Sequence, residues 1–326
     1  MFQLFDGKDK NNYLFPQKCI IFAVMEKHLY YKVAGLTFVI ELHEGIQLDG
    51  KLGAYEPFSS CAVEEPLFML KVQCSGEQNA CGNRNWKLIL DNDFEGMLTE
   101  IYMDAEGVYH YAVRFVHQLD MWSCTDFDPE FKSLTCRIHG SQNFQLFALN
   151  NALMLLFALC SAKHDTLLFH SSVIKHGGKG YMFLGKSGTG KSTHSQLWLK
   201  YIAGSELLND DNPAVRLIDG RPWVFGTPWS GKTPCYKNEQ VPVGGFLRLW
   251  QAPVNEITRL STLQAYAALL PTVSNMRWEK QCADAVNATL NKVISAVPVF
   301  SLKNRPEEAA ARMSFNAFMN ADGSNG

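Results

Sequence analysis

The sequence has almost no excess of charge of either sign. Its 326 residues include 30 Lys and Arg against 32 Asp and Glu, which gives a formal net charge of -2. The basic residues are scattered along the chain and form no cluster. Nucleic acids and anionic membrane surfaces attract proteins through excess or clustered positive charge, so neither is an expected partner.

The sequence also lacks a long uninterrupted apolar run. The most apolar stretch, residues 144–160, is interrupted by Asn150 and Asn151 and falls short of a bilayer span. The N-terminus has no basic start followed by an apolar core, so no secretory signal is predicted. We therefore expect a buried helix at this stretch and a cytoplasmic protein.

The nine cysteines show no framework spacing. Cys74 and Cys81 are the closest pair, but no second Cys/His pair stands nearby to complete a zinc site. We expect free thiols in a reducing compartment.

Apolar material is plentiful: 47% of the residues are hydrophobic and 12% are aromatic. A chain of this length is expected to form two domains. Residues 1–140 are predicted to be a β-rich N-terminal domain of unknown role, because short β-branched and aromatic runs alternate with turn residues. These runs are residues 19–25, 36–42, 67–72, 87–90 and 108–116.

Residues 141–326 show an α/β pattern. A helix that is apolar on all sides is predicted at 142–163, followed by strands and helices in alternation. The predicted strands are 166–170 continuing to 174, then 180–184 and 206–208, and the predicted helices are 191–201, 262–270 and 306–318.

The string GKSGTGKS, residues 185–192, matches the phosphate-loop pattern at every constrained position. Its glycines allow backbone N–H groups to surround phosphate oxygens, and the following helix adds a positive N-terminal end. Lys191 is expected to reach the β- and γ-phosphates, and the Ser192 hydroxyl is expected to bind Mg²⁺. We thus predict ATP and Mg²⁺ as ligands, with the loop residues as the nucleotide site: Gly185, Lys186, Ser187, Gly188, Thr189, Gly190, Lys191, Ser192 and Thr193.

Two acidic residues, Asp210 and Asp211, follow one helix and one strand after the loop. This connection is just long enough to return the chain beside Lys191. One carboxylate is expected to hold Mg²⁺ and the other to accept a proton from an attacking hydroxyl. His170, at the end of the preceding strand, is either a hydrogen-bonded polar residue without a catalytic role or a residue that positions Asp210 or stabilises the γ-phosphate charge.

Residues 165–250 resemble the catalytic domain of HPr serine kinase/phosphorylase, whose nucleotide fold is shared with phosphoenolpyruvate carboxykinases. The resemblance rests on His170 with the serines after it, the loop, and the early acidic pair. It implies a phosphate-loop carboxykinase-like domain, with Asp210 as general base, His170 supporting it, and Asp211 and Ser192 as magnesium ligands. The family's signature segment has no counterpart, which leaves the acceptor and any phosphorylase activity undefined.

Residues 226–238, GTPWSGKTPCYKN, stand where that signature would be. The segment either places Lys232 near the transferred phosphoryl group or forms a surface turn with Trp229 packed against the protein. Arg248 and Arg259 are candidate charge-stabilising residues, although a solvated or ion-paired role is the expectation for each.

These patterns predict an ATP-dependent kinase that transfers the γ-phosphate to a hydroxyl of a protein serine or a small molecule. The loop leaves two other functions open: a nucleoside-triphosphate hydrolase acting as a switch, and a non-catalytic nucleotide sensor. Assembly as a homo-oligomer also remains open.

Overall fold

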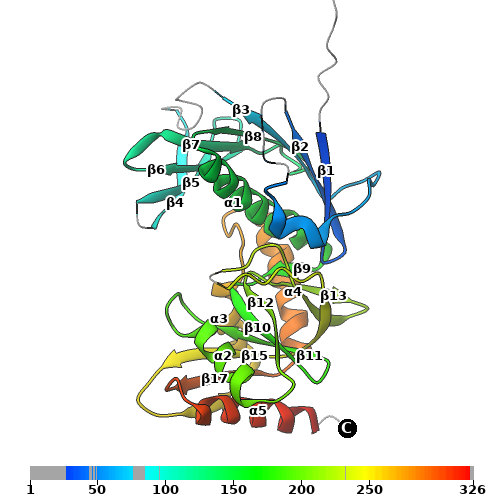
Figure 1. Cartoon of the computed structure of the whole chain (residues 1–326), viewed down its shortest axis with the longest axis vertical. Helices are drawn as coiled ribbons and strands as arrows, with labels where there is room; N and C mark the ends of the chain where they lie inside the picture. The colour runs from blue at the N-terminus through cyan, green and yellow to red at the C-terminus, as the bar shows by residue number, and fades with distance from the viewer. Residues whose placement is uncertain are drawn as a thin grey trace, which may run out of the picture.

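The computed structural model describes residues 27–323, apart from residues 44–45, 47, 49, 76–84, 95 and 232. The strand predicted at 19–25 and the side chain of Lys232 lie outside the described residues. Within them the chain is mixed α/β, with two large sheets and few helices, as the sequence predicts at this level (Figure 1).

The first sheet has eight strands in the order β1-β2-β3-β8-β7-β6-β5-β4. Predicted runs coincide with β2, β3, β4 and β6, whereas the other four strands are not predicted. The bounds are β1 (Lys27–Val33), β2 (Leu36–Leu42), β3 (Met69–Cys74), β4 (Lys87–Phe94), β5 (Met97–Met103), β6 (Tyr109–Phe115), β7 (Gln118–Asp126) and β8 (Ser133–His139). A 3-10 helix, η1 (Gly53–Phe58), lies between β2 and β3.

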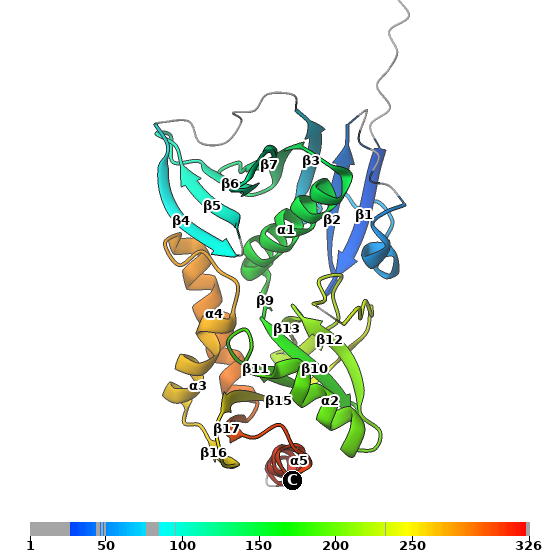
Figure 2. The same ribbon diagram turned by 60° about the vertical axis from the view of Figure 1, so that its left-hand side comes forward.

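Helix α1 (Gln142–Ser161) follows this sheet and lies against its inner face (Figure 2). It begins after Ser141, whose hydroxyl accepts a hydrogen bond from the Phe144 amide. With the turn η2 (Ala162–His164) it is long and apolar enough to cross a membrane, but 61% of the apolar window is buried. Its side chains join a core that includes Phe38 of the first sheet and Val215 of the second. The prediction of a buried helix is confirmed.

The second sheet has nine strands, with β12-β10-β11-β15-β14-β13-β9 as its main path. Strand β11 runs parallel to β15, and β15 runs parallel to β17. The bounds are β9 (Thr166–Leu168), β10 (Ser171–His176), β11 (Lys179–Leu184), β12 (Glu206–Asp211), β13 (Ala214–Ile218), β14 (Arg221–Phe225), β15 (Gln240–Gln251), β16 (Glu256–Arg259) and β17 (Val299–Asn304).

The single strand predicted from 166 to 174 is wrong. The chain leaves its strand at Phe169 and His170, so that β9 pairs with β13 while β10 pairs with β11 and β12. His170 therefore stands in a break between two strands, with its amide donating to the Thr272 carbonyl. No glycine or proline marks this change of partner in the sequence of residues 166–174.

Helices cover both faces of the second sheet (Figure 2). On one face lie α2 (Lys191–Tyr201) and α5 (Glu308–Gly323), which share a core cluster through Trp198 and Phe318. On the other lie α3 (Thr262–Leu269), the turn η3 (Leu270–Thr272) and α4 (Lys280–Ala296), whose apolar residues join the core of α1. Helix α2 has the predicted bounds, α3 and α5 differ slightly, and α4 is not predicted.

The cysteines depart from expectation at one position. Cys124 is disulfide-bonded, so the prediction of free thiols throughout is wrong. The free cysteines among the described residues are Cys61, Cys74, Cys136, Cys160, Cys235 and Cys282. A disulfide is uncommon in a reducing compartment, which is where the sequence alone would have put the protein.

Candidate active site

The phosphate loop connects the end of β11 at Leu184 to the start of α2 at Lys191. The backbone of Gly188 and Gly190 has φ values of 80° and 98°, which residues with a Cβ rarely adopt. Thr189 closes the turn, because its hydroxyl donates to the Lys186 carbonyl at 2.7 Å. Lys186, Ser187 and Gly188 are exposed, so this part of the loop is accessible to a ligand.

Lys191 lies at the mouth of the loop. Its Nζ donates to the Gly185 carbonyl at 3.1 Å and lies 2.9 Å from His170 Nε2. Burial lowers the pKa of Lys191, and the nearby carboxylates of Asp211 and Asp210 partly oppose this effect. A partly desolvated ammonium interacts more strongly with phosphate than one surrounded by water.

The acidic pair lies on the last two residues of β12. This strand runs antiparallel to β10, with Asp210 opposite Ser172 and Asp211 opposite Ser171. The pairing returns the carboxylates to the loop: Ser192 Oγ donates to Asp210 Oδ1 at 3.0 Å. The strand predicted to end at 208 thus continues through the pair.

His170 contacts the second acidic residue, since its Nδ1 lies 3.0 Å from Asp211 Oδ1. The resemblance implies that it supports Asp210, and the geometry differs on this point. One proton arrangement fits both contacts: Nδ1–H donates to Asp211, and Nε2 accepts from Lys191. In this arrangement the imidazole is neutral, and its accepting nitrogen faces the lysine.

The two carboxylates differ in accessibility. Asp210 is buried, with 4% of its surface exposed, whereas the side chains of Asp211 and His170 are 34% and 41% exposed. An incoming acceptor can therefore reach the His170–Asp211 pair more easily than Asp210.

Arg248 is a residue whose position the sequence does not reveal. It lies on β15 directly beside Leu184, the last residue before the loop. It is 8% exposed and makes no ion pair among the described residues, and its Nε is buried without a partner. The expected solvated or ion-paired role is therefore wrong for Arg248. Burial lowers its pKa, and its charge in turn lowers the pKa of Lys191.

A cavity of 620 Å³ adjoins the second half of the loop. Its walls come from the loop, the start of α2 and the chain after β15 and β17, and include Thr193, His194 and Arg305. This volume lies in the range of small-molecule sites. The predicted nucleotide residue Thr193 thus borders a space that adjoins the phosphate loop.

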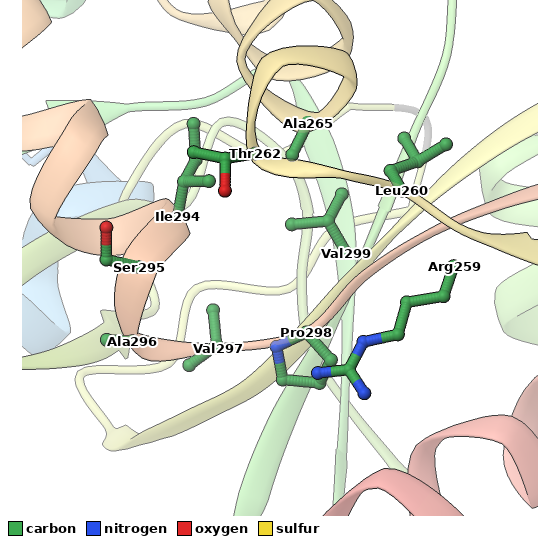
Figure 3. Close-up of a pocket in the computed structure, with 10 residues that line it drawn as sticks. All are labelled: Arg259, Leu260, Thr262, Ala265, Ile294, Ser295, Ala296, Val297, Pro298 and Val299. Carbon is green, nitrogen blue, oxygen red and sulfur yellow. The ribbon is translucent and has the colours of Figure 1, made fainter.

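Two other candidate sites among the described residues, a cavity at Arg259 and a polar group at His110, do not resemble a phosphate-binding site. Arg259 is exposed, as expected, and lines a 320 Å³ cavity between α3, α4 and β17 (Figure 3). In the first sheet, His110 lies between Asp126 and Asp104 at 2.8 and 3.2 Å, next to Cys124. The disulfide occupies the Cys124 sulfur, so this group lacks a thiolate ligand for a metal.

No family model matches the sequence, and no curated protein matches it. The resemblance to the HPr kinase/phosphorylase catalytic domain therefore rests on the loop, the acidic pair and His170.

Proposed function

We propose that this protein is an ATP-dependent phosphotransferase with a carboxykinase-like phosphate-loop domain, and that it moves the γ-phosphate to a hydroxyl of a protein serine or a small molecule. The observation that carries the proposal is the contact between Ser192 and Asp210 at the mouth of the loop, beside Lys191. In phosphate-loop nucleotidases, the loop serine or threonine and a neighbouring aspartate hold the Mg²⁺ ion of the bound nucleotide.

The donor set fits Mg²⁺, because hydroxyl and carboxylate oxygens are its preferred ligands. Two neighbouring ligands of an octahedral Mg²⁺, each at about 2.1 Å, lie about 3 Å apart. Ser192 Oγ and Asp210 Oδ1 already have this separation, at 3.0 Å. These two residues would hold the ion, which when bound neutralises charge on the β- and γ-phosphates.

Lys191 has to leave His170 to reach the phosphates. The imidazole Nε2 then loses its present donor and faces the site, while Asp211 still orients the ring through Nδ1. We assign the acceptor's proton to this His170–Asp211 pair. The resemblance implies Asp210 as the base and Asp211 as the magnesium ligand, and we exchange these two roles. The reason is that Asp211 is more exposed than Asp210.

Arg248 would provide a second cation for charge that develops on the transferred group. A buried guanidinium without a carboxylate partner is costly, and an anionic ligand offsets that cost. Arg248 lies beside Leu184, the last residue of β11, and the phosphate loop begins directly after Leu184.

The test uses ATP labelled at the γ-phosphate with Mg²⁺ and lysate from the native cell. We expect transfer of label to a hydroxyl, about 10²–10⁴-fold slower for Asp211→Asn with ATP affinity nearly unchanged. Asp210→Asn should instead remove most of the Mg²⁺ dependence of ATP binding. Asp219→Asn, on the exposed β13–β14 turn, is the matched control and should match wild type. Release of phosphate with no labelled acceptor would support a hydrolase, and tight binding without turnover would support a sensor.

A further inference from the structure

The segment that follows β14 runs along the backbone of the acidic pair. The Gly231 amide donates to the Asp210 carbonyl at 2.5 Å, and the Asn212 amide donates to the Trp229 carbonyl at 3.2 Å. Thr227 Oγ1 donates to the Asn212 carbonyl at 2.7 Å. Residues 227–231 therefore fix the peptide groups on both sides of Asp211.

Asp211 needs such support. Its φ of 152° lies in a region that residues with a Cβ rarely adopt. Strained backbone of this kind persists only where surrounding contacts determine it, and it concentrates at functional sites. The approach of the segment is close: a Cβ added to Gly231 would lie 3.0 Å from the Asp210 carbonyl oxygen and 3.2 Å from Asp211 Cβ.

The same segment is attached to the N-terminal part of the chain through Trp229. This side chain is 2% exposed, and its Nε1 donates to the Tyr55 hydroxyl at 2.9 Å. Its ring packs against Tyr55 of η1 and Phe157 of α1, at centroid distances of 6.3 and 5.1 Å. The Tyr55 hydroxyl in turn donates to Asn150 on α1 at 2.8 Å. One buried indole thus connects the phosphate-loop site to residues far away in the sequence.

We propose that Trp229 is a positioning residue for Asp210 and Asp211, and that the N-terminal domain is required for metal binding at the site because its Tyr55 holds Trp229 in place. The inference rests on the proposed function, since that function gives Asp210 a magnesium ion to hold with Ser192 and gives Asp211 a part in proton transfer. The sequence left two alternatives for residues 226–238, and this proposal uses the one in which Trp229 packs against the protein.

The test measures Mn²⁺ binding to the protein–ATP complex by electron paramagnetic resonance, which requires no acceptor and no turnover. Trp229→Phe keeps an aromatic ring but loses the N–H donor, and Tyr55→Phe removes the acceptor from the other side. For both variants we expect Mn²⁺ affinity to fall at least fivefold, while ATP affinity in excess chelator stays within twofold of wild type. A merely structural role would not divide metal binding from nucleotide binding in this way.

Trp198→Phe is the matched control. Trp198 is fully buried, and its Nε1 also donates to a hydroxyl at 2.9 Å, that of Ser314 on α5. Its variant should lose comparable thermal stability with Mn²⁺ affinity within twofold of wild type. Unchanged Mn²⁺ affinity in Trp229→Phe and Tyr55→Phe would overturn the inference, as would an equal loss in Trp198→Phe. Failure of wild type to transfer phosphate would refute the proposed kinase, but the Mn²⁺ affinities of the variants would still test the role of Trp229. Failure to bind Mn²⁺ with ATP at all would overturn both.

Discussion

Replacing Asp211 with glycine should make the protein more stable than replacing it with alanine, while both variants lose phosphoryl transfer. The φ of 152° is strained for any residue with a Cβ, and such strain costs about 1–3 kcal/mol. Glycine removes it but costs about 0.4–1 kcal/mol through the greater freedom of the unfolded chain. From the midpoints of these two ranges, the expected net advantage of glycine over alanine is about 1.3 kcal/mol.

The comparison with alanine is needed because wild type has contacts that both variants lose. The Asp211 carboxylate accepts from Asn212 Nδ2 at 2.9 Å and from His170. Thermal unfolding monitored by calorimetry measures the difference, at about 2–4 °C per kcal/mol for domains of roughly 150–250 residues. At Asp219, with φ 50° on an exposed turn, glycine and alanine variants should both keep full activity. An Asp211→Gly protein no more stable than Asp211→Ala would refute the claim that strain is stored at the site.

Three further predictions concern buried charge and close packing. Burial lowers the pKa of His194 to about 3, whereas the unfolded residue titrates near ~6.5. The unfolded state therefore binds more protons between these values, and the free energy of unfolding should fall by about 1.4 kcal/mol per pH unit below about pH 6. His194→Gln should remove this pH dependence, which corresponds to the binding of about one proton on unfolding. Chemical denaturation at a series of pH values measures it, and an unchanged slope would contradict the argument. Arg248→Lys should slow transfer about tenfold or more in the labelled-ATP assay, whereas exposed Arg259→Lys should not; equal rates would remove Arg248 from the site. Gly226→Ala should lower both stability and Mn²⁺ affinity, because the new Cβ would lie 2.0 Å from the Lys237 carbonyl oxygen; wild-type behaviour would show that the segment adapts freely.

The parts of the site that sequence predicts are those determined locally. The phosphate loop and α2 follow from glycine spacing and the helix directly after it, and both stand where the pattern puts them. The return of Asp210 to the loop follows from connection length, because one helix and one strand leave few other places for it. His170 also reaches the site, although it pairs with Asp211 rather than Asp210.

The parts that sequence does not predict depend on distant contacts. Trp229 meets Tyr55 across 174 positions of the chain, and no local pattern indicates such a pair. Arg248 looks like any strand arginine until β15 is known to lie beside β11. Helix α4 is missed although its buried residues, among them Val286, Leu290 and Val293, recur at helical spacing. Its N-terminal cap is Glu279, which is not among the preferred capping residues. The change of sheet partner at His170 is missed because no glycine or proline marks it in the sequence.

The most direct test of the central claim is calorimetric titration of ATP into the protein with Mg²⁺ and in excess chelator, for wild type and Lys191→Met. The account predicts that Mg²⁺ strengthens ATP binding to wild type at least tenfold and that Lys191→Met loses most of this affinity. Absence of Mg²⁺-dependent binding to wild type, even at millimolar ATP, would contradict it.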